Sequence, residues 1–351
     1  MSVRALVLSG GGAKGAYEAG AVTALSQGAA FDIVVGTSIG AINASLTAQH
    51  GIPALGQMWA TLAARDIIQP LPTVKRVETF LQAFSDWQTL PLVAKVSHIP
   101  HLILLWAQIG SKTALFTLLG AFDETPIEAL LRQFANYNEI KSTLIVAATD
   151  ITQRTATAFY AFAGITIENV PAFRAAASIQ TEALSPLNYV EVLEASAAIP
   201  AAFTPIQMNL GTPPPKFFVD GGVANNTPIS LAIAAGATDV TVVFLEPESN
   251  LAPAPPPRNL VDIGFACYDV MQQKIIEDDF KLAELTNIVL ANSAAASEAT
   301  RARFSSKRHV TLSYVRPSAA LPVSLLDFND QAKLDAAFAQ GLLDGRRPQT
   351  L

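Results

Sequence analysis

The sequence has few charged residues and almost no cysteine. Charged side chains make up 15% of its 351 residues, whereas an ordinary soluble domain carries about 25%. The single cysteine, Cys267, excludes an internal disulfide framework and makes a reducing compartment the default expectation. We expect it to be a small buried apolar residue. No C-x-x-C, H-E-x-x-H or similar ligand spacing is present, so no metal site is expected.

Clusters of basic residues are also missing. The chain has 23 Lys and Arg against 29 Asp and Glu, which gives a net charge of −6. Nucleic acids and anionic membranes bind proteins through concentrated positive charge. Nucleic acid is therefore not expected as a partner, and strong electrostatic capture by anionic lipid is disfavoured.

Long apolar runs are absent as well. The apolar N-terminal run is too short for the core of a signal peptide, because Gly10, Gly11 and Gly12 interrupt it. The longest run elsewhere, residues 102–109, is well short of the roughly 20 residues that cross a bilayer. We expect a cytoplasmic protein whose membrane contact is at most peripheral.

One serine stands in a pattern typical of a catalytic nucleophile. An apolar, β-branched run at residues 31–35 predicts a strand, and an Ala-rich stretch up to residue 49 predicts a helix. Between them lies Gly36-Thr37-Ser38-Ile39-Gly40, the G-x-S-x-G of a nucleophile elbow. Gly36 and Gly40 leave room for neighbouring main chain, and Ser38 sits at a helix N-terminus, where a developing anion is favoured. Ser38 is thus a candidate nucleophile.

A glycine-rich turn follows the first predicted strand, residues 5–8, and precedes a helix. Its G-x-G-x-x-G pattern also occurs in dinucleotide sites, but such a site needs an acidic residue near the end of the second strand. Here Asp32 lies near the start of that strand, and the serine elbow occupies its end. A purely structural turn remains an alternative. We favour an oxyanion hole formed by Gly10, Gly11, Gly12, Lys14 and Gly15. Each backbone donor in such a hole is worth about 3 kcal/mol, and the lysine adds positive potential.

The candidate base is an aspartate rather than a histidine. Asp220 ends an apolar strand at residues 216–219 and is followed by Gly221 and Gly222, which let other backbone approach. Partial desolvation there would raise its pKa into the range of a general base. A turn-stabilising Asp is the alternative. The four histidines, His50, His98, His101 and His309, have no motif around them.

The three motifs together resemble those of the patatin-like phospholipases, serine lipid acyl hydrolases with a Ser-Asp dyad. The resemblance covers most of residues 3–247 apart from an insert, and it includes residues 148–150 and 194–200. It implies Ser38 as the nucleophile, Asp220 as its base and the glycine turn as the oxyanion hole. It also implies a phospholipid or other acyl-ester substrate and no cofactor.

Three other functions remain to be weighed. The same dyad would serve an acyltransferase, and a catalytically silent lipid-binding or scaffold protein would keep the motifs with a blocked site. An ordinary α/β-hydrolase fits poorly, because its elbow follows several strands and its chain ends with a catalytic His. The sequence does not indicate the lipid head group, the acyl length or the oligomeric state.

The predicted fold is a single patatin-like domain over residues 1–351, a three-layer α/β/α arrangement with a mainly parallel central sheet. Residues 52–122 predict a largely helical inserted cap, and residues 260–351 a helical C-terminal extension that starts with one helix over 261–303. Residues 251–257 predict a Pro-rich loop. Two interpretations of the apolar segment 90–122 stay open: a helical hairpin packed into the core, or a cap that covers the Ser38 cleft or dips into a lipid surface.

Overall fold

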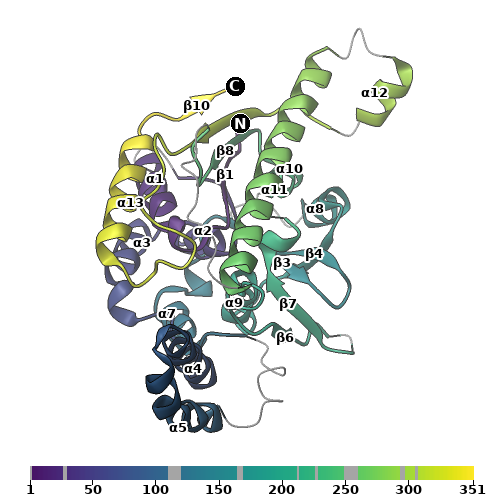
Figure 1. The fold of residues 1–351 in the computed structure, drawn as a ribbon. Coiled ribbons are helices and arrows are strands. Elements are labelled where there is room, and N and C mark those ends of the chain that lie inside the picture. Colours follow the sequence, from purple (N-terminus) through teal and green to yellow (C-terminus); the bar gives the residue numbers. More distant parts are fainter. Residues whose placement is uncertain are drawn as a thin grey trace.

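The computed structural model describes residues 2–26, 30–109, 120–163, 169–211, 213–225, 228–248, 260–292, 297–304 and 307–351. In these ranges the strands form one ten-stranded sheet, shown in Figure 1. The centre of the sheet is parallel, as expected, and its strands run in the order β9-β8-β1-β2-β3. These five strands are β1 Arg4–Leu8, β2 Ile33–Thr37, β3 Thr143–Asp150, β8 Asp239–Val243 and β9 Thr311–Val315.

The remaining strands extend the sheet at both edges. On the β3 side the pairing turns antiparallel, first with β4 and then, at the end of β3, with β7. At the opposite edge β10 pairs antiparallel with β9. The bounds are β4 Thr155–Ala161, β5 Gln180–Ala183, β6 Ile206–Met208, β7 Lys216–Asp220 and β10 Gln349–Thr350.

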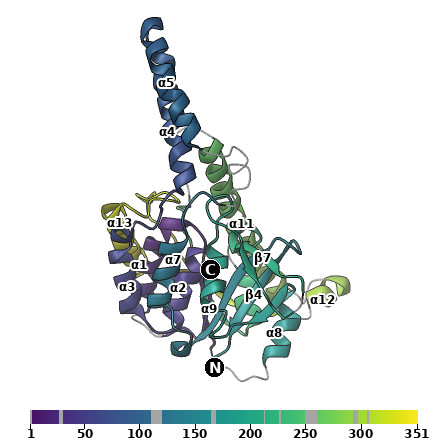
Figure 2. The same cartoon turned by 90° about the horizontal axis from the view of Figure 1, so that it is seen from below.

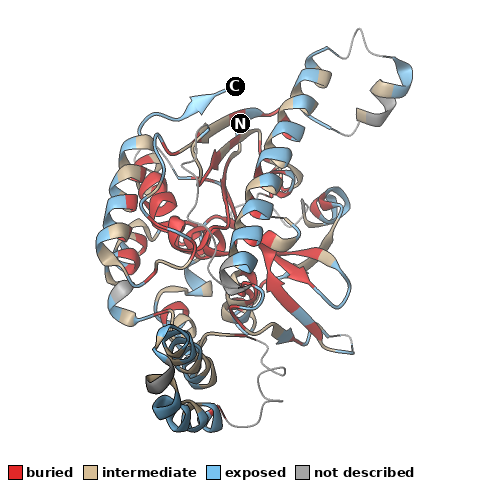
Figure 3. Ribbon diagram, in the orientation of Figure 1, coloured by how far each residue is buried: buried red, intermediate tan, exposed pale blue. Residues whose placement is uncertain are grey.

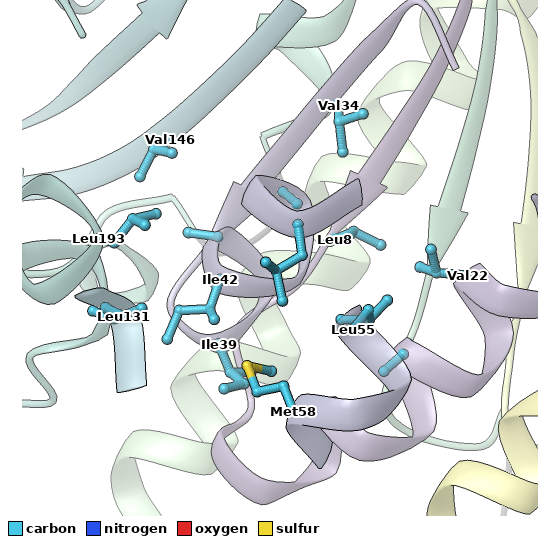
Figure 4. Close-up of a cluster of buried hydrophobic side chains, with 14 of the residues drawn as sticks. Leu8, Val22, Val34, Ile39, Ile42, Leu55, Met58, Leu131, Val146 and Leu193 are labelled. Atoms are coloured by element: carbon cyan, nitrogen blue, oxygen red, sulfur yellow. The ribbon is translucent and has the colours of Figure 1, made fainter. Parts of the chain in front are cut away.

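Helices cover both faces of the sheet, because the central strands are apolar on both sides. Leu6 and Leu8 of β1 point into one core, and Ala5 and Val7 point into the other. The first core, part of which Figure 4 shows, lies under six helices: α1 Gly15–Leu25, α2 Ile39–Ala48, α3 Ile52–Thr61, α7 Thr125–Phe134, α9 Tyr189–Ala197 and α13 Gln331–Asp344. The second lies under α8 Asn169–Ala177, α10 Ile229–Ala234 and α11 Leu260–Ala291.

The predicted insert is helical, but its two parts differ in whether they pack against the rest of the protein. The first part, α3, belongs to the body, since Leu55, Met58 and Trp59 are buried there. The second part is a hairpin of α4 (Pro72–Thr89) and α5 (Leu92–Gln108), which projects from the body in Figure 2. No residue of α4 is buried, and Val96, Ile103 and Leu104 of α5 are more than half exposed, so in the described part of residues 90–122 the interpretation that the hairpin packs into the core is wrong. Residues 110–119 of the predicted insert lie outside the described ranges.

The C-terminal extension is not purely helical. It contributes α11, α12 (Glu298–Phe304) and α13, but also strands β9 and β10. The predicted single helix over 261–303 is two helices, α11 and α12. Cys267 on α11 is exposed rather than buried, because α11 turns the neighbouring Tyr268 inward at this level instead. The predicted Pro-rich loop lies outside the described ranges.

No helix among the described residues combines the length and the apolar character needed to span a membrane.

The last helix is held against the first by a very close backbone approach. A Cβ atom at Gly341 of α13 would lie 1.9 Å from the carbonyl oxygen of Tyr17 in α1, and one at Gly20 would lie 2.0 Å from that of Phe338. Only glycine permits this spacing. Residues 331–344 are therefore an integral part of the domain rather than an appendage.

We predict that Gly341→Ala lowers the free energy of unfolding by about 1–3 kcal/mol, since the two helices must move apart. The matched control is Gly264→Ala on α11, where the added methyl group meets nothing within 4 Å. That control is expected to stabilise the helix by about 0.5–1 kcal/mol. Thermal or urea unfolding measures both. Equal stability of the two variants would contradict the described contact.

Candidate active site

Ser38 occupies a strained turn between β2 and α2. Its backbone has φ 56° and ψ −132°, a conformation that costs a non-glycine residue about 1–3 kcal/mol. The turn is also crowded: a Cβ atom at Gly40 would lie 2.6 Å from the carbonyl oxygen of Ser9, and one at Gly36 would lie 2.3 Å from that of Gly40. The predicted elbow is therefore present, and its two glycines are required by close backbone contacts.

Strand register brings Asp220 to this turn. Thr37 at the end of β2 pairs with Ala147 of β3, and the next residue of β3, Ala148, pairs with Asp220 of β7. Ser38 and Asp220 are 182 positions apart in the chain, yet they meet because β3 pairs with both of their strands.

The two side chains form a buried hydrogen-bonded pair. The Ser38 hydroxyl donates to Asp220 Oδ2 at 2.5 Å, and Oδ1 accepts from the N–H of Gly222 at 2.8 Å. Ser38 is 2% exposed and Asp220 is 0% exposed. Burial raises the pKa of Asp220 to about 6, although hydrogen bonds from Ser38 and Gly222 and the nearby Tyr268 hydroxyl oppose the shift. Asp220 is ionised at neutral pH and can accept the serine proton.

Three further hydrogen bonds hold the backbone of the pair. The N–H of Ser38 donates to Ser196 Oγ at 3.0 Å, and the Ser196 hydroxyl donates to the carbonyl oxygen of Ala147 at 2.6 Å. The hydroxyl of Thr149 donates to the carbonyl oxygen of Asp220 at 2.9 Å. Ser196 and Thr149 belong to the two segments noted for their resemblance, but the sequence did not indicate their contacts.

Tyr268 is a site residue that the sequence did not indicate. It lies on α11, is almost fully buried, and its hydroxyl interacts with the Asp220 carboxylate. The hydroxyl makes no hydrogen bond of regular geometry in the described part of the chain. No local pattern marks Tyr268, because its role depends on where α11 lies across the sheet.

The glycine-rich turn lies beside the elbow, because Gly40 of the elbow packs against the carbonyl oxygen of Ser9 at the start of the turn. It forms a short 3₁₀ helix, Gly12–Lys14, and Gly12 has a φ of +56°. The N–H of Ala13 donates to the carbonyl oxygen of Leu325 at 3.0 Å. The N–H groups of Gly11 and Gly12 have no protein acceptor in the described ranges.

A buried glutamate fixes the start of this turn. Glu18 of α1 accepts a hydrogen bond from the N–H of Ser9 at 2.8 Å and another from the Asn43 amide of α2 at 2.8 Å. Trp59 donates to the same Asn43 at 2.9 Å. Burial raises the pKa of Glu18 to about 8, and the hydrogen bonds from Asn43 and Ser9 oppose the shift. The network links the glycine turn to the elbow helix, and the sequence did not indicate it.

Lys14 has partners that were not expected. Its ammonium group binds Glu246, which follows β8, and Asp269 of α11 at 2.9 Å. Burial lowers the pKa of Lys14, but these two carboxylates outweigh it and the net shift is upward. Two carboxylates neutralise the ammonium group of Lys14. Lys14 therefore links the glycine turn to α11 and adds little positive potential.

None of the four histidines, all of which are in the described ranges, bonds to Ser38 or Asp220. His50 bonds to Ser142 Oγ at 3.0 Å, His98 bonds within α5, and neither His101 nor His309 bonds to Ser38 or Asp220. In the described ranges the hydrogen-bonded pair is thus a serine and an aspartate, and no histidine is bonded to either.

A separate cavity lies at the other end of the sheet. It has a volume of about 780 Å³ and is lined by Val3, which precedes β1, together with residues of α8, α10 and α11 such as Asp279. Ser38 follows the carboxyl end of β2, so this cavity is remote from the dyad.

An α/β sheet with a strained serine elbow, and a carboxylate bonded to the serine hydroxyl, defines the class of serine hydrolases. The family is then given by direct comparison. The model of the family described as patatin-like phospholipase matches residues 6–233, which is more than half of the chain, and the chain belongs to this family. It is accordingly a lipid acyl hydrolase in general terms.

Comparison with other proteins adds little beyond the family. The solved structures include a similar one, the crystal structure of VipD from Legionella pneumophila, with 15% identity and a TM-score of 0.41. The similarity covers 100% of this chain and 68% of that one. None of the curated proteins matches the sequence.

The raised pKa of Asp220 leads to a prediction about how the free energy of unfolding depends on pH. Its pKa is about 6 in the folded protein and 3.8 ordinarily, so the stabilisation it contributes is complete below pH 3.8 and is lost as the pH rises through 6. At pH 8 the fold therefore buries a destabilising charge. We expect Asp220→Asn to raise the free energy of unfolding at pH 8, on the order of 1–3 kcal/mol, with a smaller gain near pH 4.

Urea unfolding at the two pH values measures this effect. The matched control is Asp239→Asn, since hydrogen bonds from Ser2 and Thr238 lower the pKa of Asp239 and reverse the sign. An Asp220→Asn variant that is no more stable than wild type at pH 8 would refute the buried, proton-accepting state of this carboxylate.

Proposed function

We propose that the protein is a carboxylic-ester hydrolase of the phospholipase A or lysophospholipase type that works through an acyl-enzyme on Ser38. The observation that carries this proposal is the 2.5 Å hydrogen bond from the Ser38 hydroxyl to Asp220, made at a strained elbow. The pKa of Asp220, about 6, suits a base that acts at neutral pH.

Acylation of Ser38 is the first half of the reaction. Asp220 Oδ2 takes the hydroxyl proton while Ser38 Oγ attacks the ester carbonyl carbon. The carbonyl oxygen becomes an oxyanion, for which the N–H groups of Gly11 and Gly12 are the available donors. The intermediate collapses when the alcohol leaves with the proton from Asp220. The acyl group then remains on Ser38.

Deacylation repeats the same steps with water. Asp220 takes a proton from a water molecule, whose oxygen attacks the acyl carbon. Collapse of the second intermediate breaks the bond to Ser38 Oγ, which recovers its proton from Asp220. The fatty acid leaves, and the dyad returns to its starting state. If another alcohol replaced water in this step, the product would be a new ester.

An apolar cluster beside the dyad suits a fatty acyl chain. Its buried members are Ala198, Ile199, Ala202, Phe203, Tyr268 and Leu325. The cluster adjoins the site at two points: the carbonyl oxygen of Ala198 accepts from the N–H of Asp220 at 2.8 Å, and that of Leu325 accepts from Ala13. Partly buried apolar side chains, among them Ile68, Val223 and Phe265, pack against this cluster. Each CH₂ group that leaves water against them is stabilised by about 0.8 kcal/mol.

The central test is hydrolysis by the dyad variants. Ser38→Ala removes the nucleophile and Asp220→Asn removes the proton acceptor, so each is expected to reduce kcat on p-nitrophenyl butyrate by about 10³-fold or more. Labelling by a fluorophosphonate probe should occur in wild type and disappear in Ser38→Ala. Wild-type protein that is neither labelled nor active would identify a silent binding protein instead.

The pH dependence provides an independent test. Asp220 must be ionised to act, so kcat/KM should fall about tenfold per pH unit below an apparent pKa near 6. Histidine titrates in a similar range, so His50→Ala and His309→Ala serve as controls and should keep the wild-type profile. Loss of the acid limb in either histidine variant would assign the base to that histidine.

A further inference from the structure

The α4–α5 hairpin carries apolar side chains that are exposed in the described part of the protein. Val96 is 64% exposed and Ile103 is 63% exposed, and Ile99 and Trp106 are also exposed. In Figure 3 the hairpin is drawn in the colours of exposed and intermediate residues along almost its whole length. Burial of apolar surface is the main driving force of folding, so an uncovered stretch of this size is unusual.

Four of the exposed apolar residues of α5 lie on one face of the helix, and Leu104, which is 56% exposed, lies to one side of it. Val96, Ile99, Ile103 and Trp106 follow one another at spacings of three, four and three residues, which is the spacing of a helical stripe. We call these four residues the docking face. Two contacts join α5 to α4: Phe80 and Trp106 have ring centroids 5.0 Å apart, and Trp87 Nε1 donates to the carbonyl oxygen of Lys95 at 2.8 Å. Trp106 therefore packs on α4 with part of its ring and remains 43% exposed.

The charge of the hairpin is close to zero. Residues 72–109 contain three basic and two acidic side chains, a net charge of +1: Lys75, Arg76, Lys95, Glu78 and Asp86. Only Lys95 lies on α5. Such a surface is not suited to a partner that is recognised by charge, whether nucleic acid or an acidic protein. It suits an apolar surface with a zwitterionic border.

The base of the hairpin adjoins the catalytic site. The N–H groups of Ala121 and Phe122 both donate to the carbonyl oxygen of Ala202 at 2.9 Å. Ala202 belongs to the loop that also binds Asp220 through Ala198. The hairpin therefore stands at the end of the sheet that carries the dyad, and its 18-residue α4 reaches about 27 Å from the body (Figure 2).

We propose that the docking face binds the surface of a phospholipid bilayer and holds the dyad close to it. The choice of a bilayer rests on the proposed function, because a lipid acyl hydrolase must take its substrate from a lipid surface. Helices with an apolar stripe lie in the plane of the interface with that stripe buried about 5–10 Å deep. Trp106 suits this position, since a tryptophan combines a large apolar ring with a polar N–H, and such side chains collect at the boundary between lipid and water. The binding is driven by apolar contact and depends little on salt.

The test measures binding to phosphatidylcholine vesicles, with Ser38→Ala in every protein so that no lipid is consumed. Val96→Asp with Ile103→Asp places two charges on the docking face and should lower the partition coefficient in sedimentation by about tenfold or more. The matched control is Val270→Asp with Leu285→Asp on α11, where the exposed fractions are 66% and 57%, and it should bind like the parent. Binding of the parent should be similar in about 0.1 M and about 1 M sodium chloride.

Tryptophan fluorescence of the unmutated chain gives a second measurement that no folding defect can affect. Quenching by phosphatidylcholine brominated on its acyl chains should occur and should be lost in Trp106→Phe. No quenching, or equal vesicle binding by the two double variants, would overturn the proposal. So would conversion of an oligomer to a monomer by the docking-face changes with vesicle binding unaltered, because the face would then join two copies of the chain.

Hydrolysis distinguishes this proposal from the proposed function. With Ser38 restored, the docking-face variant should keep the wild-type rate on soluble p-nitrophenyl butyrate and lose activity on vesicles. A protein that binds vesicles through this face but hydrolyses neither substrate would support the docking face and refute the enzyme assignment.

Discussion

The structure depends on one constraint: the main chain around Ser38 must fit into a space that admits no side chain. Gly40 lies against the backbone of Ser9 and Gly36 against that of Gly40, while Ser38 itself is strained. The hydrogen bonds from Ser38 to Ser196, and from Ser9 to Glu18, hold the elbow and the glycine turn in this arrangement. The surrounding packing offsets a strain that a short peptide of the same sequence would relieve.

The same packing places ionisable groups where water cannot reach them. Asp220 and Glu18 are both fully buried, and burial raises the pKa of Asp220 to about 6 and that of Glu18 to about 8. Desolvation makes Asp220 a better proton acceptor, and it also makes the ionised carboxylate costly to keep in the fold. Reactivity and stability are thus set against each other at one side chain. The strand pairing around β3, a strand that is buried throughout, offsets the free-energy cost of keeping this carboxylate ionised.

Segments beyond the family match complete the site from outside. Tyr268 and Asp269 come from α11, and Leu325 comes from the segment before α13. They contact Asp220, Lys14 and Ala13 respectively, so the residues of the motifs do not form a closed site by themselves. The α1–α13 contact fixes this outer layer, because α1 also carries Glu18 and follows the glycine turn. The C-terminal region therefore contributes to both the fold and the site.

The local features of this protein were predictable from its sequence. A strand, a turn and a helix at Ser38, a second glycine turn after β1, and a strand that ends at Asp220 all arise from residue patterns within about ten positions, where periodicity and glycine placement decide the backbone. The contacts of Tyr268, Glu18 and Lys14 were not predictable, because each joins groups that are distant in sequence or oriented by helix packing. The hairpin shows the same limit: its composition demands contact with something apolar, but only the tertiary structure shows that the core does not provide it. Hydrophobicity determines that a surface avoids water, whereas the position of the helix determines what covers it.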